Sequence, residues 1–399
     1  MNELKIDIIP TTIFLNEDGT YNKTDSIKQS GKYAGVCYNK EGYYALINED
    51  DAKTMRRINL TMNNGHLSVY DHNFISFNMQ NIPKILAMVL NNEHMYTTSE
   101  KSARYTKIEK KENSIITDKE INLYNKWREI FEDKISEEYH EVFNDTKIKK
   151  LAQENARYLV TVFMPTQMIY TTSLRQINYL ASIMFDYIKN ADLSDKFQRE
   201  LAKSMQEFLR ELNRLKVLEP GLMRNEKNRK ISLFGKNINL NNYYYGNVYE
   251  TNYKSSFAYL AQAQRHRTLN YKMEFLEKPE FYVPPIIEDS YFLKSEWLQD
   301  MSRVKEVIPQ GELVKIRETG MQEDFVLKLK ERLCSAAQLE IARQTKDILN
   351  KYIETVKVTD QDLYNDMLPY SHGARCTFPD FECTEQCNFK EGINLKRRI

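Results

Sequence analysis

The stretch QAQRHRTLNYKMEF, residues 262–275, places two arginines around a histidine at the end of a helical pattern. Arg265, His266 and Arg267 are consecutive, and Gln262 lies about one helical turn upstream. Such a group suits an anion or an electron-rich ring, because arginine offers a planar fork of donors to phosphate and carboxylate groups. A basic surface patch has the same pattern, so the stretch is not specific by itself.

The composition limits the partners that this charge can serve. The 399 residues include 57 Lys and Arg against 56 Asp and Glu, and a formal charge of +1 is low for a general nucleic-acid binder. No apolar run reaches the roughly 18 residues of a membrane span, and the opening MNELKIDIIP lacks the apolar core of a signal peptide. Five cysteines, an odd number, favour a reducing compartment. We therefore expect a cytoplasmic protein that binds neither nucleic acid nor membrane.

The order of the patterns divides the chain into two halves. Residues 194–218 have apolar side chains at spacings of three and four, typical of an amphipathic helix, and Pro220 follows it. A second helical region is predicted over 147–188, interrupted near Pro165. We predict a first unit over 1–220, a connector over 221–238, a second unit over 239–370 and a cysteine-bearing tail over 371–399.

The first half has a charged stretch of its own, MYTTSEKSARYTK, residues 95–107. If it is extended, Glu100, Ser102 and Arg104 project from one face about 7 Å apart. A carboxylate, a hydroxyl and a guanidinium in a row fit a ribose hydroxyl and a phosphate. A solvated surface segment is the alternative on spacing alone.

Taken together, the two stretches resemble the signature of flavin-dependent thymidylate synthases, which reads R-H-R, then six or so residues, then E-x-S-x-R-Y. Each half keeps one piece. The second half keeps RHR, but the positions that should follow hold Met273, Phe275 and Glu277. The first half keeps Glu100, Ser102 and Arg104, but the RHR positions hold Asn92, Glu93 and His94. The chain therefore resembles a tandem, diverged pair of family units.

Three further stretches resemble the family. NGHLSVYDHNFISF, residues 64–77, is similar to its G-H-x-S/T-x-x-x-H strand and supplies His66. ENARYL resembles its E-x-A-R helix and places Arg157 on a nucleotide-binding arginine, with Arg175 on a later one. RLCSAAQLEIARQ resembles its R-x-x-x-x-A-Q-x-E-I-R helix and supplies Arg332, where the first half has Met184.

The resemblance implies a fold, a reaction and a set of site residues. The fold is α+β, with two tandem units that each contain a small twisted antiparallel sheet and long helices. The reaction is methylation of dUMP to dTMP, with methylenetetrahydrofolate as carbon donor, FAD as hydride donor and NADPH as reductant. Arg265, His266 and Arg267 are expected to hold FAD. The residues expected to bind dUMP are Gln262, Glu100, Ser102, Ala103, Arg104, Arg157 and Arg332. Arg332, Arg104 and His66 are expected to act in catalysis.

Because family members are homotetramers, a dimer of fused chains is expected. Two alternatives remain: a non-catalytic paralogue that binds flavin or nucleotide, and a variant that transfers a one-carbon group to another pyrimidine nucleotide. No cysteine has the P-C-H context of the unrelated thymidylate synthases, and Cys37 is expected to be a buried apolar side chain. The tail offers His372 and three cysteines, but their spacing matches no zinc module, so no metal is predicted.

Overall fold

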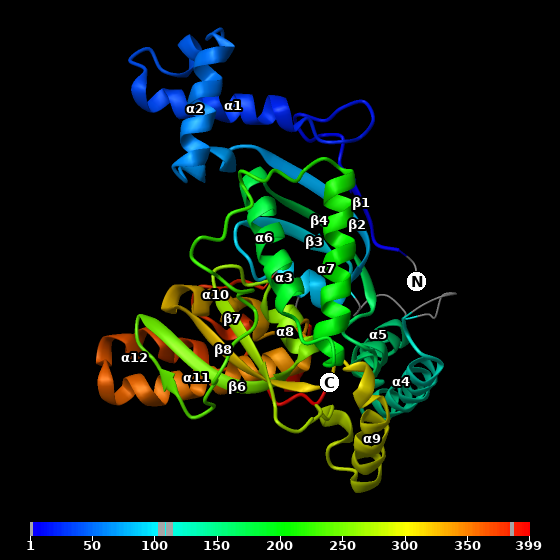
Figure 1. The fold of residues 1–399 in the computed structure, drawn as a ribbon. Coiled ribbons are helices and arrows are strands. Elements are labelled where there is room, and N and C mark those ends of the chain that lie inside the picture. Colours follow the sequence, from blue (N-terminus) through cyan, green and yellow to red (C-terminus); the bar gives the residue numbers. More distant parts are fainter. Residues whose placement is uncertain (1–2, 103–107, 109–114, 384–386) are drawn as a thin grey trace. The chain divides into compact units, whose positions relative to one another are not determined.

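The chain folds into two compact units, each built around one antiparallel sheet (Figure 1). The computed structural model describes residues 3–102, 108, 115–383 and 387–399. The first-sheet unit contains Asn2–Lys101 and Pro165–Ser232, and the second-sheet unit contains Ser102–Met164 and Leu233–Ile399. The predicted α+β class, with one small antiparallel sheet in each half, is confirmed.

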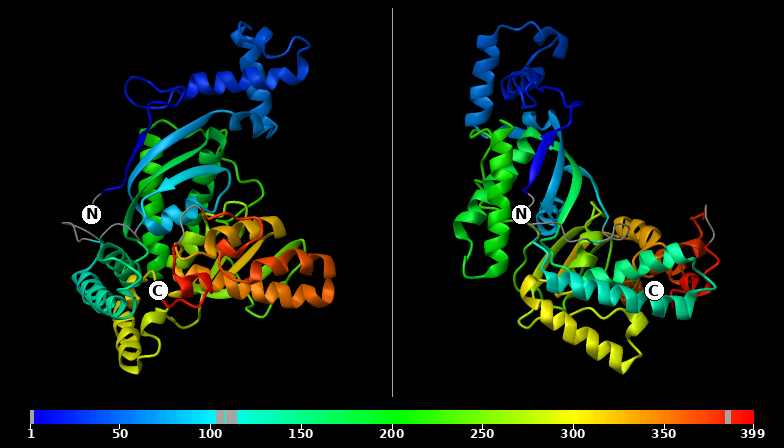
Figure 2. Two further views of the ribbon diagram at one scale, coloured as in Figure 1. Left: turned by 180° about the vertical axis from the view of Figure 1, so that it is seen from behind. Right: turned by 90° about the vertical axis from the view of Figure 1, so that its right-hand side faces the viewer.

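The first sheet has the strand order β1-β2-β4-β3, and every neighbouring pair is antiparallel. Its strands are β1 (Lys5–Ile8), β2 (Phe74–Pro83), β3 (Tyr96–Glu100) and β4 (Pro165–Ser173). The unit's helices include α3 (Lys84–Leu90), α6 (Leu174–Asn190) and α7 (Lys196–Arg214). Helices α6 and α7 cover one face of this sheet (Figures 1 and 2). Burial alternates along β2, as expected for a sheet with one face on a core.

The second sheet has the strand order β5-β6-β8-β7, again with antiparallel pairs. Its strands are β5 (Tyr243–Tyr244), β6 (Val248–Ser256), β7 (Asn270–Phe275) and β8 (Leu313–Met321). Helix α8 (Phe257–Ala263) follows β6. The helices α10 (Gln322–Arg332), α11 (Leu339–Thr359) and α12 (Gln361–Met367) follow β8 in that order.

The two sheets repeat one topology. In each, a seven-residue helix follows the long second strand, and a longer helix follows the closing strand that begins at Pro165 or Leu313. The pairing also matches, since Tyr170 lies opposite Thr98 in the first sheet and Glu318 lies opposite Tyr271 in the second. This agreement favours an internal duplication, and it matches the paired residues of β2, β3 and β4 with those of β6, β7 and β8.

The helices between the third and closing strands of both sheets share one core in the second-sheet unit. They are α4 (Asp118–Tyr139), α5 (Asp145–Ala156), the short η4 (Arg157–Leu159) and α9 (Tyr291–Val304). The rings of Trp127 and Trp297 pack edge to face at 4.9 Å, and Trp127 Nε1 donates to Asp300 at 2.9 Å. The sequence predicts residues 102–164 in a first unit over 1–220. In the structure they belong to the second-sheet unit, because the apolar face of α4 packs on α9.

Equivalent residues of the two halves meet at a seam inside the second-sheet unit. Thr161 and Pro309 form an antiparallel bridge, and each lies four residues before its closing strand. The flanking hydrogen bonds run from Val162 N to Ile308 O at 2.9 Å and from Gln310 N to Val160 O at 2.8 Å. A two-fold axis pairs equivalent residues in this way. A local pseudo-two-fold axis therefore passes through the seam.

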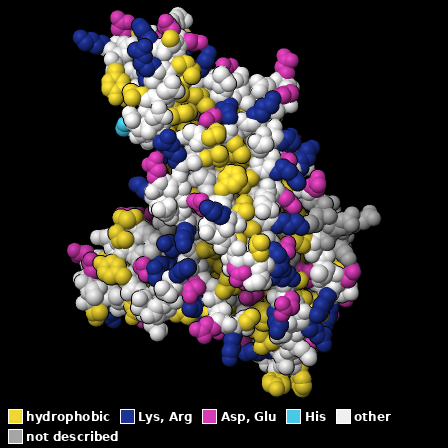
Figure 3. Space-filling model, viewed as in Figure 1, with side chains coloured by type: hydrophobic (Ala, Val, Ile, Leu, Met, Phe, Trp, Pro, Cys, Tyr) yellow, Lys and Arg dark blue, Asp and Glu magenta, His cyan; other side chains and the backbone are white. Residues whose placement is uncertain are grey.

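An insertion of two helices separates β1 from β2 in the first-sheet unit. Helix α1 (Lys23–Gly35) packs on α2 (Asp51–Asn63), and a Cβ on Gly31 would lie 2.6 Å from Ile58 Cγ1, so this crossing requires a glycine. Hydrophobic side chains are visible on this part in Figure 3, and Tyr38 and Tyr44 are more than four-fifths exposed at 89% and 83%. The insertion thus presents apolar surface, which is typical of contact regions.

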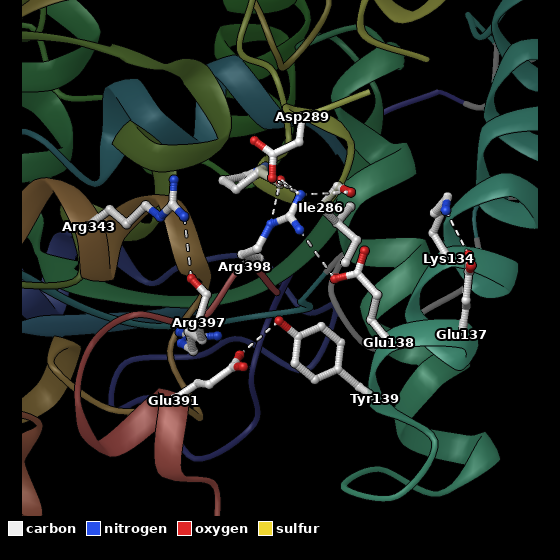
Figure 4. A network of polar contacts seen from close by, with 11 residues as sticks. Lys134, Glu137, Glu138, Tyr139, Ile286, Asp289, Arg343, Glu391, Arg397 and Arg398 are labelled. Atoms are coloured by element: carbon white, nitrogen blue, oxygen red, sulfur yellow. Dashed lines mark hydrogen bonds and ion pairs between the residues drawn. The ribbon is translucent and has the colours of Figure 1, made fainter. Parts of the chain in front are cut away.

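The C-terminal tail packs as a part of the second-sheet unit (Figure 4). Arg398 Nη2 donates to the Pro285 carbonyl at 3.0 Å and pairs with Asp289 at 3.0 Å. Tyr139 donates its hydroxyl hydrogen to Glu391 at 2.9 Å. The tail predicted as a separate region over 371–399 is therefore anchored to α4 and to the loop before α9.

The predicted helices are confirmed in part. The helix expected over 194–218 is α7, which Asp195 caps by accepting from Gln198 N. The helical prediction over 147–188 is wrong where β4 lies, because the β-branched and aromatic residues of MIYTT pair with β2 and β3. Across the described part of the chain, no helix is both long and apolar enough to span a membrane.

Candidate functional site

The RHR residues lie in the turn between α8 and β7 of the second-sheet unit. Ser256 begins α8 by accepting from Tyr259 N, and the helix ends one residue before Gln264, which leaves the arginines in the turn. His266 is buried, with 5% of its surface exposed, whereas Arg265 and Arg267 are exposed. The histidine therefore belongs to the protein's interior, and the two guanidinium groups can reach a ligand.

His266 holds Arg332, the last residue of α10. Arg332 Nε donates to His266 Nε2 at 2.7 Å, so the accepting ring nitrogen carries no proton. Burial holds the pKa of His266 well below its usual range, and the cations of Arg332 and Lys328 lower it further. The Glu331 carboxylate lies 3.6 Å from the other ring nitrogen, Nδ1. The pair is thus a neutral imidazole that orients a guanidinium.

Gln262 lies on α8, four residues before His266. Its Oε1 is buried and has no hydrogen-bond partner among the described residues. A buried acceptor without a partner costs free energy unless a ligand or water supplies a donor. Gln262 therefore fits the role of accepting a hydrogen bond from a bound molecule.

Arg157, a residue of the first half, lies in the second-sheet unit. Its Nη2 donates to Gln338 Oε1 at 2.7 Å, and Gln338 in turn donates to the hydroxyl of Tyr158. Tyr158 donates to Glu340, which also accepts from the backbone and hydroxyl of Ser256 at 2.8 and 2.7 Å. Burial raises the pKa of Glu340, although the Ser256 donors oppose the shift. The network connects Arg157 to the start of α8.

The row predicted over Glu100, Ser102 and Arg104 is described only in part. Glu100 ends β3 with a side chain 3% exposed, and it accepts from Lys84 Nζ at 2.6 Å and Asn91 Nδ2 at 3.4 Å. Ser102 is half-buried. Ala103 and Arg104 lie outside the described residues. The structure thus adds Lys84 as the partner of Glu100, and the role of the row stays a prediction.

His66 and Arg175 lie in the first-sheet unit. His66 is exposed and precedes a short 3₁₀ turn, η3 (Leu67–Asp71). Arg175 pairs with Asp71 at 2.6 Å, and Asp71 also accepts from the hydroxyl of Ser173. The exposed imidazole can reach a ligand, but no described contact assigns it one.

Two of the first-half counterparts of the RHR residues, Asn92 and Glu93, form hydrogen bonds with Ser232 of the connector. Glu93, the counterpart of His266, accepts from Ser232 N at 2.6 Å, and Asn92 Nδ2 donates to Ser232 Oγ at 2.8 Å. Burial raises the pKa of Glu93. Met184, the counterpart of Arg332, is buried. Ser232 of the connector therefore bonds to the residues that stand where the second half has Arg265 and His266.

The cysteines form no described metal centre. Within residues 3–102, 108, 115–383 and 387–399, no group of three or more His, Cys, Asp or Glu side chains is placed to hold a metal ion. Within the described residues, Cys376, Cys383 and Cys387 form no disulfide. Cys37 is exposed, so the expectation of a buried side chain is wrong, because its short helix η1 (Val36–Tyr38) has no buried residue.

Sequence reasoning missed several residues that hold the site together. Gln338 and Glu340 lie in the AQLEI stretch, whose resemblance to the family could have indicated them. Nothing marked Tyr158, Glu318 or Lys328. Lys328 in particular lies in the alternating stretch LKLKER, which is typical of a solvated helix face, yet its side chain is fully buried.

Comparison with known proteins finds one family and a group of solved structures. The family model described as thymidylate synthase complementing protein matches residues 21–214. A UMP/dUMP methylase, PolB, from Streptomyces cacaoi, bound with 5-Br dUMP, is 17% identical over 54% of this chain and 92% of its own, with a TM-score of 0.32. Thymidylate synthase X from Helicobacter pylori, with FAD and dUMP, is 14% identical over 55% of this chain and 100% of its own, with a TM-score of 0.30. No curated protein matches the chain.

Proposed function

Because the chain belongs, over residues 21–214, to the thymidylate synthase complementing protein family, we propose that it is a flavin-dependent thymidylate synthase that methylates dUMP to dTMP. The observation that carries the proposal is the hydrogen bond between the buried His266 and the partly buried Arg332, beside the exposed Arg265 and Arg267. Gln262 Oε1 adds a buried acceptor that has no hydrogen-bond partner among the described residues. These groups fit an anionic cofactor and a pyrimidine nucleotide.

Each group has a role that follows from its chemistry. Arg265 and Arg267 would hold the phosphates and the electron-rich ring of FAD. Gln262 Oε1 would accept from the ring N–H of dUMP, and Arg332 would stabilise negative charge on the pyrimidine carbonyls as C5 becomes nucleophilic. When bound, FAD supplies the hydride, methylenetetrahydrofolate the carbon and NADPH the reducing equivalents. The nucleotide is activated by charge, so no enzyme nucleophile is required.

The test of this function is growth of a thymidine-requiring strain that carries only this gene for thymidylate synthesis. The wild-type chain should support growth without thymidine, because dTMP is then made from dUMP. The variant Arg332→Ala should not, while Lys330→Ala, which removes a surface cation of the same helix, should grow. Equal growth of all three strains would contradict the role of Arg332, and growth of none would contradict the function.

We predict that both halves contribute to dUMP binding. Changing Arg104 or Arg332 to alanine should each weaken binding by about 1.5 to 3 kcal/mol, the range for a charge-assisted hydrogen bond. Isothermal titration with dUMP measures the effect. The control is Asn92→Ala, since Asn92 bonds to Ser232 and should not touch the nucleotide. An unchanged dissociation constant for Arg104→Ala means that the composite site is wrong.

We also predict one FAD and one dUMP per chain. A family homotetramer has equivalent sites, but here Glu93 and Met184 replace the histidine and arginine in one half, and Ser232 closes that position. A carboxylate in place of the histidine would repel an anionic ligand nearby. Flavin absorbance and titration of the purified protein give the stoichiometry, and mass measurement in solution should give a dimer. Two FAD per chain would show that the first-half position is open.

A further inference from the structure

A buried ion pair lies inside the core of the second sheet. Lys328 Nζ is 2.7 Å from Glu318 Oε2, and neither side chain is exposed. Glu318 also accepts from the hydroxyls of Tyr249 and Tyr253. Tyr259 completes the group, with its hydroxyl 2.9 Å from that of Tyr253 and 3.3 Å from Lys328 Nζ. Both charged groups are thus buried and hydrogen-bonded to other protein groups.

The first sheet builds the same core without charge. The strand registers and the helices that follow the strands match Tyr249, Tyr253, Tyr259, Glu318 and Lys328 with Ile75, Met79, Leu86, Tyr170 and Leu180. All five first-sheet residues are buried. A buried ion pair is often no more stable than apolar side chains of similar volume, because desolvating two charges offsets their attraction. Stability of this fold therefore does not account for the ion pair.

The ion pair occurs in the half that keeps the His266–Arg332 pair. Lys328 and Arg332 lie four residues apart on α10, so they share one face of the helix. In the first half, Leu180 replaces Lys328, and Met184 and Glu93 replace Arg332 and His266. The buried charges and the arginine–histidine pair are kept together or lost together.

We infer that Lys328 and Glu318 form a positioning unit for Arg332. Glu318 and Tyr259 bind the ammonium of Lys328 and so fix the orientation of α10. In this orientation Arg332 Nε reaches His266 Nε2. Because Nε2 accepts, the proton of His266 is confined to Nδ1. The cation of Lys328 also disfavours a second proton on the ring, which would break the bond to Arg332. What Arg332 binds rests on the proposed function, whereas how it is held does not.

The test compares two variants of the full chain by nitrogen NMR of labelled histidine. Glu318→Gln combined with Lys328→Met removes both charges, and the first sheet shows that such a core can fold. The matched control is Lys330→Met, which removes a lysine of α10 that pairs with Asp380 at the surface. A His266→Asn spectrum identifies the His266 signals among those of the six histidines. Circular dichroism checks folding.

In the wild type and the control, His266 should show the Nδ1–H tautomer alone. In the double variant it should show a mixture of tautomers, and the dissociation constant of dUMP should rise about tenfold. An unchanged tautomer in a folded double variant overturns the inference. Should that variant unfold, Glu318→Tyr with Lys328→Leu, which carries the first-sheet residues, gives the same comparison. If the wild type binds no dUMP, the proposed function fails, but the tautomer comparison still decides the positioning role.

Discussion

Replacing Trp127 by alanine should lower the free energy of unfolding of the second-sheet unit by about 3–5 kcal/mol, the range for truncating a large buried aromatic side chain. Trp127 is fully buried, packs on Trp297 at 4.9 Å and donates to Asp300. The truncation would leave a cavity and remove the hydrogen bond to a buried carboxylate. Chemical denaturation followed by tryptophan fluorescence measures the change.

The control for this loss is Phe292→Ala on α9. Phe292 is 83% exposed, so its truncation should change the free energy of unfolding by less than about 0.5 kcal/mol. If Trp127→Ala costs no more than Phe292→Ala, helix α4 does not belong to this core. The comparison therefore tests whether residues 102–164 fold with the second half.

Replacing Glu312 by glutamine should stabilise the protein at alkaline pH and leave it unchanged in acid. Glu312 is 7% exposed, and burial raises the pKa of its carboxyl to about 7 from an ordinary value of 4.5. Between these two values the folded state keeps a proton that the unfolded state releases, so stability falls as the pH rises. The full loss above pH 7 is about 3 kcal/mol, at about 1.4 kcal/mol for each pH unit.

Glutamine resembles the protonated carboxyl and does not titrate. At pH 8 the Glu312→Gln variant should therefore be more stable than the wild type by about 3 kcal/mol, and at pH 4 the two should agree. Urea denaturation at both pH values measures the difference. The exposed Glu277→Gln serves as control and should show no such dependence. A Glu312→Gln variant that gains nothing at pH 8 would mean that the carboxyl is hydrated in the fold.

The sequence predicted the fold class because local patterns and the family signature point the same way. Helix α7 was found from its apolar spacing, which depends only on neighbours in the chain. Strand β4 was missed because its identity is decided by pairing with β2, about 90 residues away. The placement of residues 102–164 was missed for the same reason, since Trp127 finds Trp297 through a contact that no local pattern encodes.

The contacts among the candidate site residues were not predicted, and the role of these residues stays a prediction. The signature indicated His266 and Arg332, and the structure joins them by a hydrogen bond across 66 positions of the chain. Lys328 was not predicted, because a lysine in an alternating stretch is usually solvated. Its burial depends on contacts with residues distant in the sequence, the Glu318 carboxylate of β8 and the Tyr259 hydroxyl of α8.

The seam at Thr161 and Pro309 has an evolutionary consequence. In a symmetric dimer encoded by one gene, every mutation near the axis appears twice, so a change that helps one side and harms the other is rejected. If this chain arose by duplication and fusion, as the repeated topology favours, the two copies of such a residue can change independently. Thr161 donates its hydroxyl hydrogen to the Val307 carbonyl. Pro309, the equivalent residue across the pseudo-two-fold axis, has no hydroxyl or amide hydrogen to donate. In a fused chain, the site residues of one half can therefore be replaced one at a time while those of the other half remain under selection.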